Sequence, residues 1–228
     1  MTKRMEQGSR PKQLLAVRDI EIALNGMAGT LAIPADARAL VVFAHGSGSS
    51  RFSPRNRAVA HALNETGIGT LLMDLLTSEE EADRANVFDI HLLAGRLVDA
   101  VRWLGDEEET RSLALGFFGA STGAAAALVA AARLGARVGA VVSKGGRPDL
   151  AGEALDRIVT PTLLIVGGAD YGVIELNEEA FARLMGPKAL TIVPGATHLF
   201  PEPGALDALI EHAAAWFKTY LQAGEPDA

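Results

Sequence analysis

Six short apolar runs dominate the chain after Pro34, and they constrain its fold more than any other feature of the sequence. They cover residues 39–44, 68–73, 113–118, 138–142, 162–166 and 190–193. Within each run the apolar residues are nearly continuous rather than alternating with polar ones. A strand of this kind must be covered on both faces, as strands are in a parallel sheet. The runs therefore predict the strands of a parallel sheet.

The segments between these runs predict helices. Apolar residues recur with helical spacing over 90–104 and over 206–221, so helices alternate with the strands. Upstream, the apolar segments 14–24 and 27–33 flank Asn25-Gly26, a dipeptide that tolerates the positive φ angles of a type I′ turn, which predicts an antiparallel hairpin. Together these elements predict an α/β fold, with a mostly parallel sheet of about eight strands, an N-terminal antiparallel hairpin and helices on both faces.

The chain is predicted to form a single domain over residues 13–222. No internal repeat and no interdomain linker interrupts the alternation of strands and helices, and 228 residues fit one large α/β domain. Residues 1–12 and 223–228 are polar and rich in Gly, Pro and charge, and we interpret them as flexible tails. Residues 145–161 leave room for little more than a loop and a short helix, so no large lid domain is expected.

Composition argues against several classes of function. The chain has no cysteine, which excludes disulfides, thiolate metal sites and a cysteine nucleophile. Its five histidines show no paired spacing of metal ligands, and we expect no metal or other cofactor. A formal charge of -7 argues against nucleic acid or an anionic membrane surface as the main partner. No apolar run is long enough to span a membrane and no signal peptide is visible, so a cytoplasmic location is the default expectation.

Ser121 is the candidate nucleophile. It lies in a G-x-S-x-G motif at residues 119–123, directly after the apolar run 113–118 and before the alanine-rich stretch 124–134. A sharp turn from strand to helix lifts a serine hydroxyl out of the sheet, and small flanking residues let the strand and the helix approach closely. Such a motif occurs by chance in about one sequence of this composition in ten, so it needs support from the rest of the chain.

That support comes from Asp170 and His198, which follow two late strands on short loops, where ligands of open parallel sheets bind. A nucleophilic serine needs a base to take its proton and a carboxylate to orient that base. Ser121, Asp170 and His198 occur along the chain in the order that this arrangement requires. Asp149 is the alternative acid, Asp170 could instead cap the following helix, and His198 could be a loop residue without a role. Three other histidines fall within predicted helices and are interpreted as structural: His61, His91 and His212.

The backbone amides of Ser47 and Thr122 are the candidate donors to a developing oxyanion. Thr122 follows the candidate nucleophile, and Ser47 lies in the glycine-rich loop 45–50 after the first parallel strand. A phosphate-binding role for this loop is disfavoured, because the G-x-x-x-x-G-K-[ST] pattern is absent and no helix begins directly after the glycines.

The set formed by residues 45–48, residues 119–123, Asp170 and His198 resembles the α/β-hydrolase superfamily. Over residues 14–221 the chain looks like the small single-domain members related to dienelactone hydrolase. The resemblance implies the α/β-hydrolase fold and a serine esterase-like mechanism. Dienelactone hydrolases use a cysteine nucleophile, whereas this chain has Ser121. The expected activity is hydrolysis of a carboxylic ester, thioester or lactone of a small soluble substrate through an acyl-enzyme on Ser121.

Two other classes of function remain open. The same three side chains could pass the acyl group to an acceptor other than water, as in an acyltransferase or a perhydrolase. The fold could also bind a small molecule or a protein without catalysis, since fold alone does not establish activity. The oligomeric state is open as well.

Basic residues gather near the ends of the predicted strands. Arg51 and Arg55 follow the glycine-rich loop, and Lys144 and Arg147 follow the strand after Ser121. They are candidates for binding an anionic group on the substrate. The alternative is that Arg147 pairs with Asp149 and that the others cap helices or face solvent.

Two further features have both a functional and a structural interpretation. Tyr171 and Phe200 are candidate apolar walls of the substrate site, although core packing explains them equally well. The acidic run at residues 79–81, with Asp83, lies in a predicted loop and is interpreted as solvated.

Overall fold

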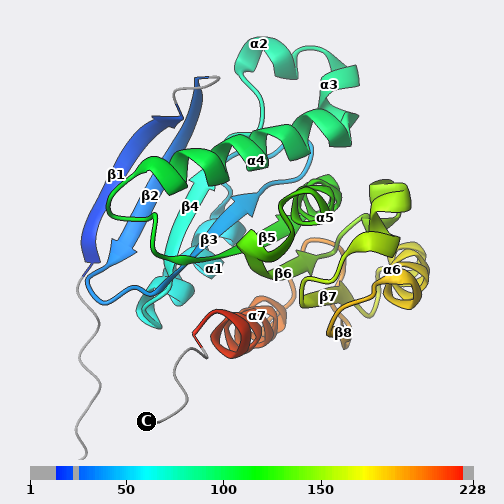
Figure 1. Ribbon diagram of the computed structural model, residues 1–228. Helices are drawn as coiled ribbons and strands as arrows, with labels where there is room; N and C mark the ends of the chain where they lie inside the picture. The colour runs from blue at the N-terminus through cyan, green and yellow to red at the C-terminus, as the bar shows by residue number, and fades with distance from the viewer. Residues whose placement is uncertain (1–13, 23–25, 223–228) are drawn as a thin grey trace, which may run out of the picture.

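A computed structural model describes residues 14–22 and 26–222, which form one eight-stranded sheet with helices on both of its faces (Figure 1). The order of the strands across the sheet is β1-β2-β4-β3-β5-β6-β7-β8. The strands from β4 to β8 in this order are parallel, whereas β1 and β2 run antiparallel to their neighbours. The strands are β1 (Leu14–Ile22), β2 (Met27–Pro34), β3 (Ala39–Ala44), β4 (Gly69–Met73), β5 (Ala114–Ala120), β6 (Val138–Lys144), β7 (Thr162–Gly167) and β8 (Lys188–Val193).

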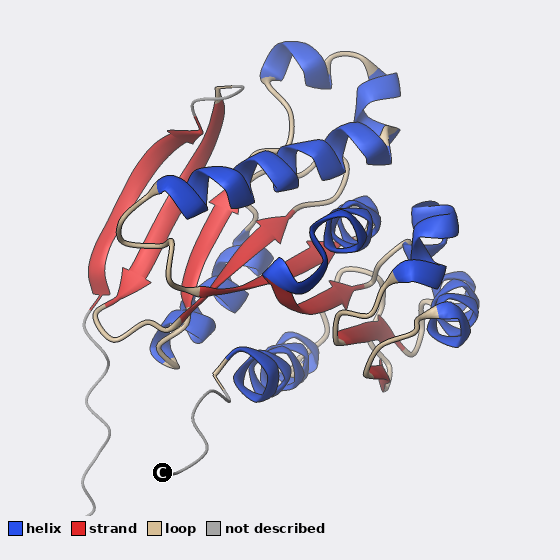
Figure 2. Cartoon of the chain, viewed as in Figure 1, coloured by secondary structure: helices blue, strands red, loops and turns tan. Residues whose placement is uncertain are grey.

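The helices divide into two layers, which Figure 2 shows on either side of the sheet. Helices α1 and α7 pack on one face, and α4, α5 and α6 pack on the other. The helices are α1 (Pro54–Glu65), α2 (Ser78–Glu81), α3 (Arg84–Phe88), α4 (Ile90–Asp106), α5 (Thr122–Leu134), α6 (Tyr171–Arg183) and α7 (Ala205–Leu221), with 3₁₀ segments η1 (Gly135–Arg137) and η2 (Pro148–Arg157).

Strand β3 shows why the apolar runs had to be covered on both faces. Leu40, Val42 and Ala44 belong to the core under α4 and α5. Val41 and Phe43 point the other way and belong to the core under α1 and α7. Because successive side chains of a strand point to opposite faces, a continuous apolar run supplies both cores at once. The prediction of a mostly parallel sheet with helices on both faces is confirmed.

The N-terminal hairpin is confirmed as antiparallel. Ile22 pairs with Met27, and β1 as described ends at Ile22, two residues before the predicted end at Leu24. Gly26 has φ 68, as a tight turn requires. Asn25 lies outside the described residues, as do the predicted tails 1–12 and 223–228.

The acidic run at residues 79–81 lies in a helix and not in a loop, although Glu79, Glu81 and Asp83 are exposed to solvent, as the sequence predicts. Its residues form the short helix α2, which begins with a capping box between Thr77 and Glu80. The carboxylate of Glu80 also accepts a hydrogen bond from Arg96 on α4.

Among the residues that the structure describes, no helix is long and apolar enough to cross a membrane.

Candidate active site

Ser121 occupies a strained turn between β5 and α5. Its backbone has φ 51 and ψ -122, which is an unfavourable conformation for any residue with a Cβ atom. The turn is tight because the backbones around it nearly touch: a Cβ atom on Gly123 would lie 2.2 Å from the carbonyl oxygen of Ala44. A Cβ atom on Gly119 would lie 2.5 Å from the Cα atom of Ala124. The two motif glycines therefore hold Ser121 at the end of the sheet, next to the end of β3.

The predicted base and acid are in direct contact. Asp170 directly precedes α6, and its Oδ2 lies 2.7 Å from Nδ1 of His198, which follows β8. Through this bond the carboxylate fixes the orientation of the ring and leaves Nε2 for a second partner. Ser121 and His198 line the same cavity, of about 340 Å³, although no hydrogen bond joins their side chains in the described structure. Asp149, the alternative acid, accepts hydrogen bonds from Nε and Nη2 of Arg147, at 2.9 and 2.7 Å.

The two predicted oxyanion donors lie next to each other. The Ser47 amide donates to the Thr122 hydroxyl at 3.0 Å, so the loop after β3 is tied directly to the turn at Ser121. The Thr122 amide is the first in α5 and by its position has no acceptor within the helix. Gly46 keeps the loop close, because a Cβ atom there would lie 2.9 Å from the Cβ of Ser121.

His45 supports this loop rather than the reaction. Its Nε2 accepts a hydrogen bond from the Leu75 amide at 3.1 Å, and its Nδ1 lies 3.0 Å from the carbonyl oxygen of Gly46. This pattern identifies a neutral ring that donates from Nδ1, and both nitrogens are occupied by backbone. The ring therefore connects the loop after β3 to the segment after β4.

The model of the dienelactone hydrolase family matches residues 27–221, which contain the whole site. The chain belongs to the dienelactone hydrolase family. The crystal structure of a dienelactone hydrolase from Anabaena variabilis is 52% identical, with a TM-score of 0.87 over 93% of this chain and 100% of that one. Carboxyl esterase 2 from the fungus Tuber melanosporum shares the fold at 18% identity, with a TM-score of 0.70 over 94% of this chain and 89% of that one. The chain is therefore an α/β hydrolase.

Two curated proteins from strains of Mycobacterium tuberculosis are 60% identical to this family member over 195 residues. Both are described as phosphoribosyl transferases. The match covers 86% of this chain and 44% of each relative, so the chain spans less than half the length of these proteins.

The four basic residues proposed from sequence fall into two groups in the structure of this chain. Arg51 forms an ion pair with Asp74, to which its amide also donates at 2.8 Å, and Arg147 is paired with Asp149. Lys144 and Arg55 instead line the cavity of Ser121 and His198. Burial and the nearby Arg55 charge lower the pKa of Lys144 to about 8.

The two aromatic candidates lie in different environments. Phe200 is 2% exposed and belongs to the core under α7, with its ring centroid 5.5 Å from the Lys144 amino nitrogen. Tyr171, the first residue of α6, is 75% exposed. Neither is among the described residues that line the cavity of Ser121, whereas Leu199 is.

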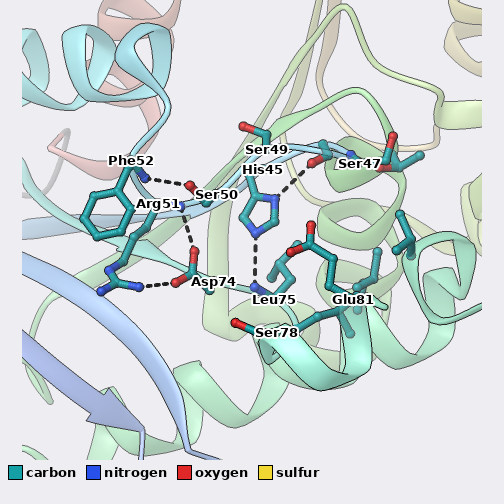
Figure 3. A pocket seen from close by; sticks show the side chains of 15 residues that line it. His45, Ser47, Ser49, Ser50, Arg51, Phe52, Asp74, Leu75, Ser78 and Glu81 are labelled. Atoms are coloured by element: carbon teal, nitrogen blue, oxygen red, sulfur yellow. Dashed lines mark hydrogen bonds and ion pairs between the residues drawn. The ribbon is translucent and has the colours of Figure 1, made fainter. Parts of the chain in front are cut away.

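A second cavity, of about 250 Å³, lies on the other side of the loop after β3 (Figure 3). Ser47 and Thr122 both line this cavity, and Ser47 also lines the cavity of Ser121. Leu75 and Leu93 supply apolar walls. The carboxylate of Glu81 on α2 projects toward His45. Sequence reasoning missed Glu81, because the acidic run carries no signal that distinguishes one of its members. Within residues 14–22 and 26–222, no group of three or more His, Asp or Glu side chains could hold a metal ion.

Glycine at position 121 is expected to stabilise the fold while removing the hydroxyl. Relief of a backbone strain of about 1–3 kcal/mol, less the extra entropy of an unfolded glycine, leaves a gain of about 1 kcal/mol, or about 2–4 °C in Tm. Thermal unfolding of the Ser121→Gly and Ser121→Ala variants checks this, because alanine keeps the Cβ atom and its strain. A glycine variant no more stable than the alanine variant would contradict the strain at this turn.

Proposed function

We propose that the chain hydrolyses carboxylic esters, thioesters or lactones of small substrates through an acyl-enzyme on Ser121. The observation that carries this proposal is the bond of 2.7 Å between Asp170 and His198, at the edge of a cavity that Ser121 also lines. A carboxylate that orients an imidazole beside a serine in the same cavity is the arrangement that activates a weak nucleophile. Membership of the dienelactone hydrolase family supports the same reaction class.

In the proposed reaction His198 takes the proton of the Ser121 hydroxyl while Oγ attacks the carbonyl carbon. The imidazolium is stabilised by Asp170 and then gives its proton to the leaving oxygen or sulfur atom, which leaves an acyl-enzyme. Water enters, His198 takes a proton from it, and the resulting attack releases the acid and regenerates Ser121. No metal or cofactor is required for any of these steps.

The oxyanion formed in each half-reaction would be held by backbone amides. The Thr122 amide is already without a helical acceptor, and donors of this kind are effective because they need no reorganisation. The Ser47 amide is bound to the Thr122 hydroxyl at 3.0 Å. It joins the oxyanion site when the substrate oxygen replaces or shares that acceptor.

A fluorophosphonate probe tests the nucleophile without knowledge of the substrate. The purified protein is incubated with the probe, digested and mapped by peptide mass spectrometry. We expect one adduct, on Ser121, and none in the Ser121→Ala variant. Ser47 and Ser49 line the same cavity and serve as internal controls that stay unlabelled. Absence of labelling in folded protein, or labelling that persists in the alanine variant, would refute the proposed nucleophile.

A further inference from the structure

Asn177 is a buried polar residue to which the proposed reaction gives no role. It lies in α6, whose buried residues are Asn177 and Ala180, and it is 0% exposed. Its side-chain nitrogen Nδ2 donates to the carbonyl oxygen of Gly146 at 3.0 Å and to that of Val173 at 2.7 Å. Because both neighbours are acceptors, the atom between them is the donor, which fixes the orientation of the side-chain amide.

The bond to Gly146 explains why a polar residue occupies this buried position. Burying an amide is unfavourable unless its polar atoms are paired, and Oδ1 of Asn177 has no partner among the described residues. The bond to Val173 lies within α6 and joins no two elements of the fold. What Asn177 adds is therefore a link from α6 to residues 145–147, the loop that follows β6.

The peptide group that accepts this bond also supports the turn of Ser121. The Gly146 carbonyl and the Arg147 amide belong to one peptide group, and that amide donates to the Ser121 carbonyl oxygen at 3.1 Å. The Ser121 carbonyl shares the next peptide group with the Thr122 amide. A trans peptide group points its C=O and its N–H in opposite directions, so the successive bonds run in one direction. Two peptide groups therefore connect Asn177 to the proposed oxyanion donor.

This series of hydrogen bonds acts on the Thr122 amide in two ways. The ψ angle of Ser121, -122, sets the plane of the peptide group that carries this amide, and the bond from Arg147 holds the oxygen of that group in place. The Ala124 amide donates to the same oxygen at 3.1 Å, so two residues hold it. Each bond that a carbonyl accepts also polarises its peptide group and strengthens the bond that its N–H donates, by about 10–30%.

Close packing leaves the loop at residues 145–147 little room for another position. A Cβ atom on Gly146 would lie 2.0 Å from Oγ of Ser143 and 2.7 Å from Cβ of Ala124, so the loop is packed against β6 and α5. Asn177 holds the carbonyl oxygen of the same glycine from α6. The peptide group between residues 146 and 147 is therefore fixed by two helices and a strand.

The base is supported by a different residue of this loop. A Cβ atom on Gly145 would lie 3.1 Å from the carbonyl oxygen of His198 and 3.4 Å from its Nδ1, so Gly145 packs against the imidazole. The Gly145 amide has its own acceptor, the Ile165 carbonyl oxygen at 2.8 Å. Loss of Asn177 should therefore disturb the peptide group that supports Ser121 and leave the base in place.

We propose that Asn177 is a positioning residue for the oxyanion site, which orients and polarises the Thr122 amide through two intervening peptide groups. The inference rests on the proposed function, in which that amide binds the oxyanion. Asn177 does not contact the reacting atoms, and an apolar residue of the same size cannot supply its bond to Gly146. Because α6 begins directly after Asp170, one helix carries the proposed acid at its start and the support of the oxyanion donor two turns later.

Asn177→Leu tests this role, because leucine keeps the size of the side chain and removes the donor. Removal of an oxyanion donor lowers kcat about 10²- to 10³-fold, and this variant weakens a donor without removing it, so we expect a loss of about 10-fold. KM for 4-nitrophenyl acetate should stay unchanged, since the amide stabilises the oxyanion rather than the bound ester. An unchanged kcat, or a higher KM with kcat unchanged, would overturn the proposal.

A trifluoromethyl ketone gives a second readout of the same donor. 1,1,1-Trifluoroacetone adds to an activated serine and forms a hemiketal oxyanion, so its affinity follows the stabilisation of the transition state. Its inhibition constant should rise in Asn177→Leu by the factor by which kcat/KM falls. An inhibition constant equal to that of the wild type would locate the loss away from the oxyanion and reject the role of Asn177.

Asn64→Leu is the matched control for the loss of a buried amide. Asn64 lies in α1, is 9% exposed and donates from Nδ2 to the Ile68 carbonyl oxygen at 2.9 Å. Both leucine variants leave a carbonyl without this donor, so we expect both to lower Tm. Only Asn177→Leu should lower kcat and raise the inhibition constant. Equal losses of kcat in the two variants would assign the effect to a loosened fold and contradict the proposal.

Asn177→Asp provides a test that does not depend on folding of the leucine variant. A buried carboxyl group resists ionisation, and in its protonated form it can donate to Gly146 as the amide does. The ratio of kcat in this variant to kcat in the wild type should be near one at low pH and should fall as the pH rises, because a carboxylate only accepts. His198 titrates in both proteins and cancels in the ratio. A ratio that is low throughout, or that rises with pH, would count against the proposal.

Amide resonances separate failure of this role from failure of the proposed function. The amide ¹H and ¹⁵N signals of Arg147 and Thr122 should shift in Asn177→Leu and stay in place in Asn64→Leu, whether or not the protein is a hydrolase. If they shift while the wild type neither hydrolyses esters nor is labelled at Ser121, the proposed function fails and the positioning of the Thr122 amide stands. Turnover and labelling, with unshifted signals and full kcat in Asn177→Leu, would reject the role of Asn177 alone.

Discussion

Alanine at Ser121 and alanine at His198 are each expected to lower kcat for ester hydrolysis by about 10⁴- to 10⁶-fold, with a double variant no worse than the poorer single variant. The reason is that a serine without its base is as inert as a missing serine, so the two side chains contribute as one unit. Steady-state hydrolysis of 4-nitrophenyl acetate by the three variants measures the effect. Losses that multiply in the double variant would mean that the two side chains act separately.

Asp170→Asn extends the test to the acid. Asparagine keeps the shape of the side chain but favours the wrong tautomer of His198, which in a serine triad costs about 10⁴-fold in kcat. Asp149→Asn is the matched control, because that carboxylate is held by Arg147 and does not contact His198. If Asp149→Asn were inactive and Asp170→Asn retained activity, the assignment of the acid would be reversed. Tm values of both variants equal to that of the wild type would show that a loss of activity does not arise from unfolding.

The central strands were predictable because burial on both faces requires a short, nearly continuous run of apolar residues. Each side chain of β3 is buried, and alternate side chains enter opposite cores. The ends of the strands were less predictable. β5 and β6 each extend two residues beyond their apolar runs, to Ala120 and Lys144, where small or polar residues continue the pairing. Those extensions matter, because they place Ser121 and Lys144 next to each other at the end of the sheet.

Sequence identified the candidate residues of the site but could not assign their partners. The candidate serine, acid and base were selected by their positions after strands, since parallel strands bring their carboxyl ends to one edge of the sheet. The separation of paired from unpaired cations depends on contacts between distant segments, such as Arg51 with Asp74, and no local pattern encodes it. For the same reason the bond from Ser47 to Thr122, and the position of Glu81 at a cavity, were not predicted.

Alanine at Gly123 is expected to damage the fold and the site together. A Cβ atom there would lie 2.2 Å from the carbonyl oxygen of Ala44, the last residue of β3, and 2.4 Å from that of His45, the next residue. Since neither oxygen belongs to a side chain that could rotate away, β3 and α5 must separate. We expect a loss of about 3 kcal/mol in the free energy of unfolding, which lowers Tm by about 6–12 °C. The movement also displaces the loop that carries Ser47. Turnover should therefore be lower than in the wild type even at temperatures below the Tm of the variant, where it is still folded.

Gly95→Ala is the matched control for the Gly123 substitution. Gly95 lies within α4, and a Cβ atom there would meet nothing within 4 Å. Alanine is the better helix former, so this variant should gain about 0.5–1 kcal/mol and keep full activity. Thermal unfolding and ester turnover, measured for both variants, separate the two effects of a single added methyl group. If Gly123→Ala unfolded at the temperature of the wild type, the close approach of β3 and α5 would be disproved. The small residues of the motif would then have another cause than the packing that presents Ser121.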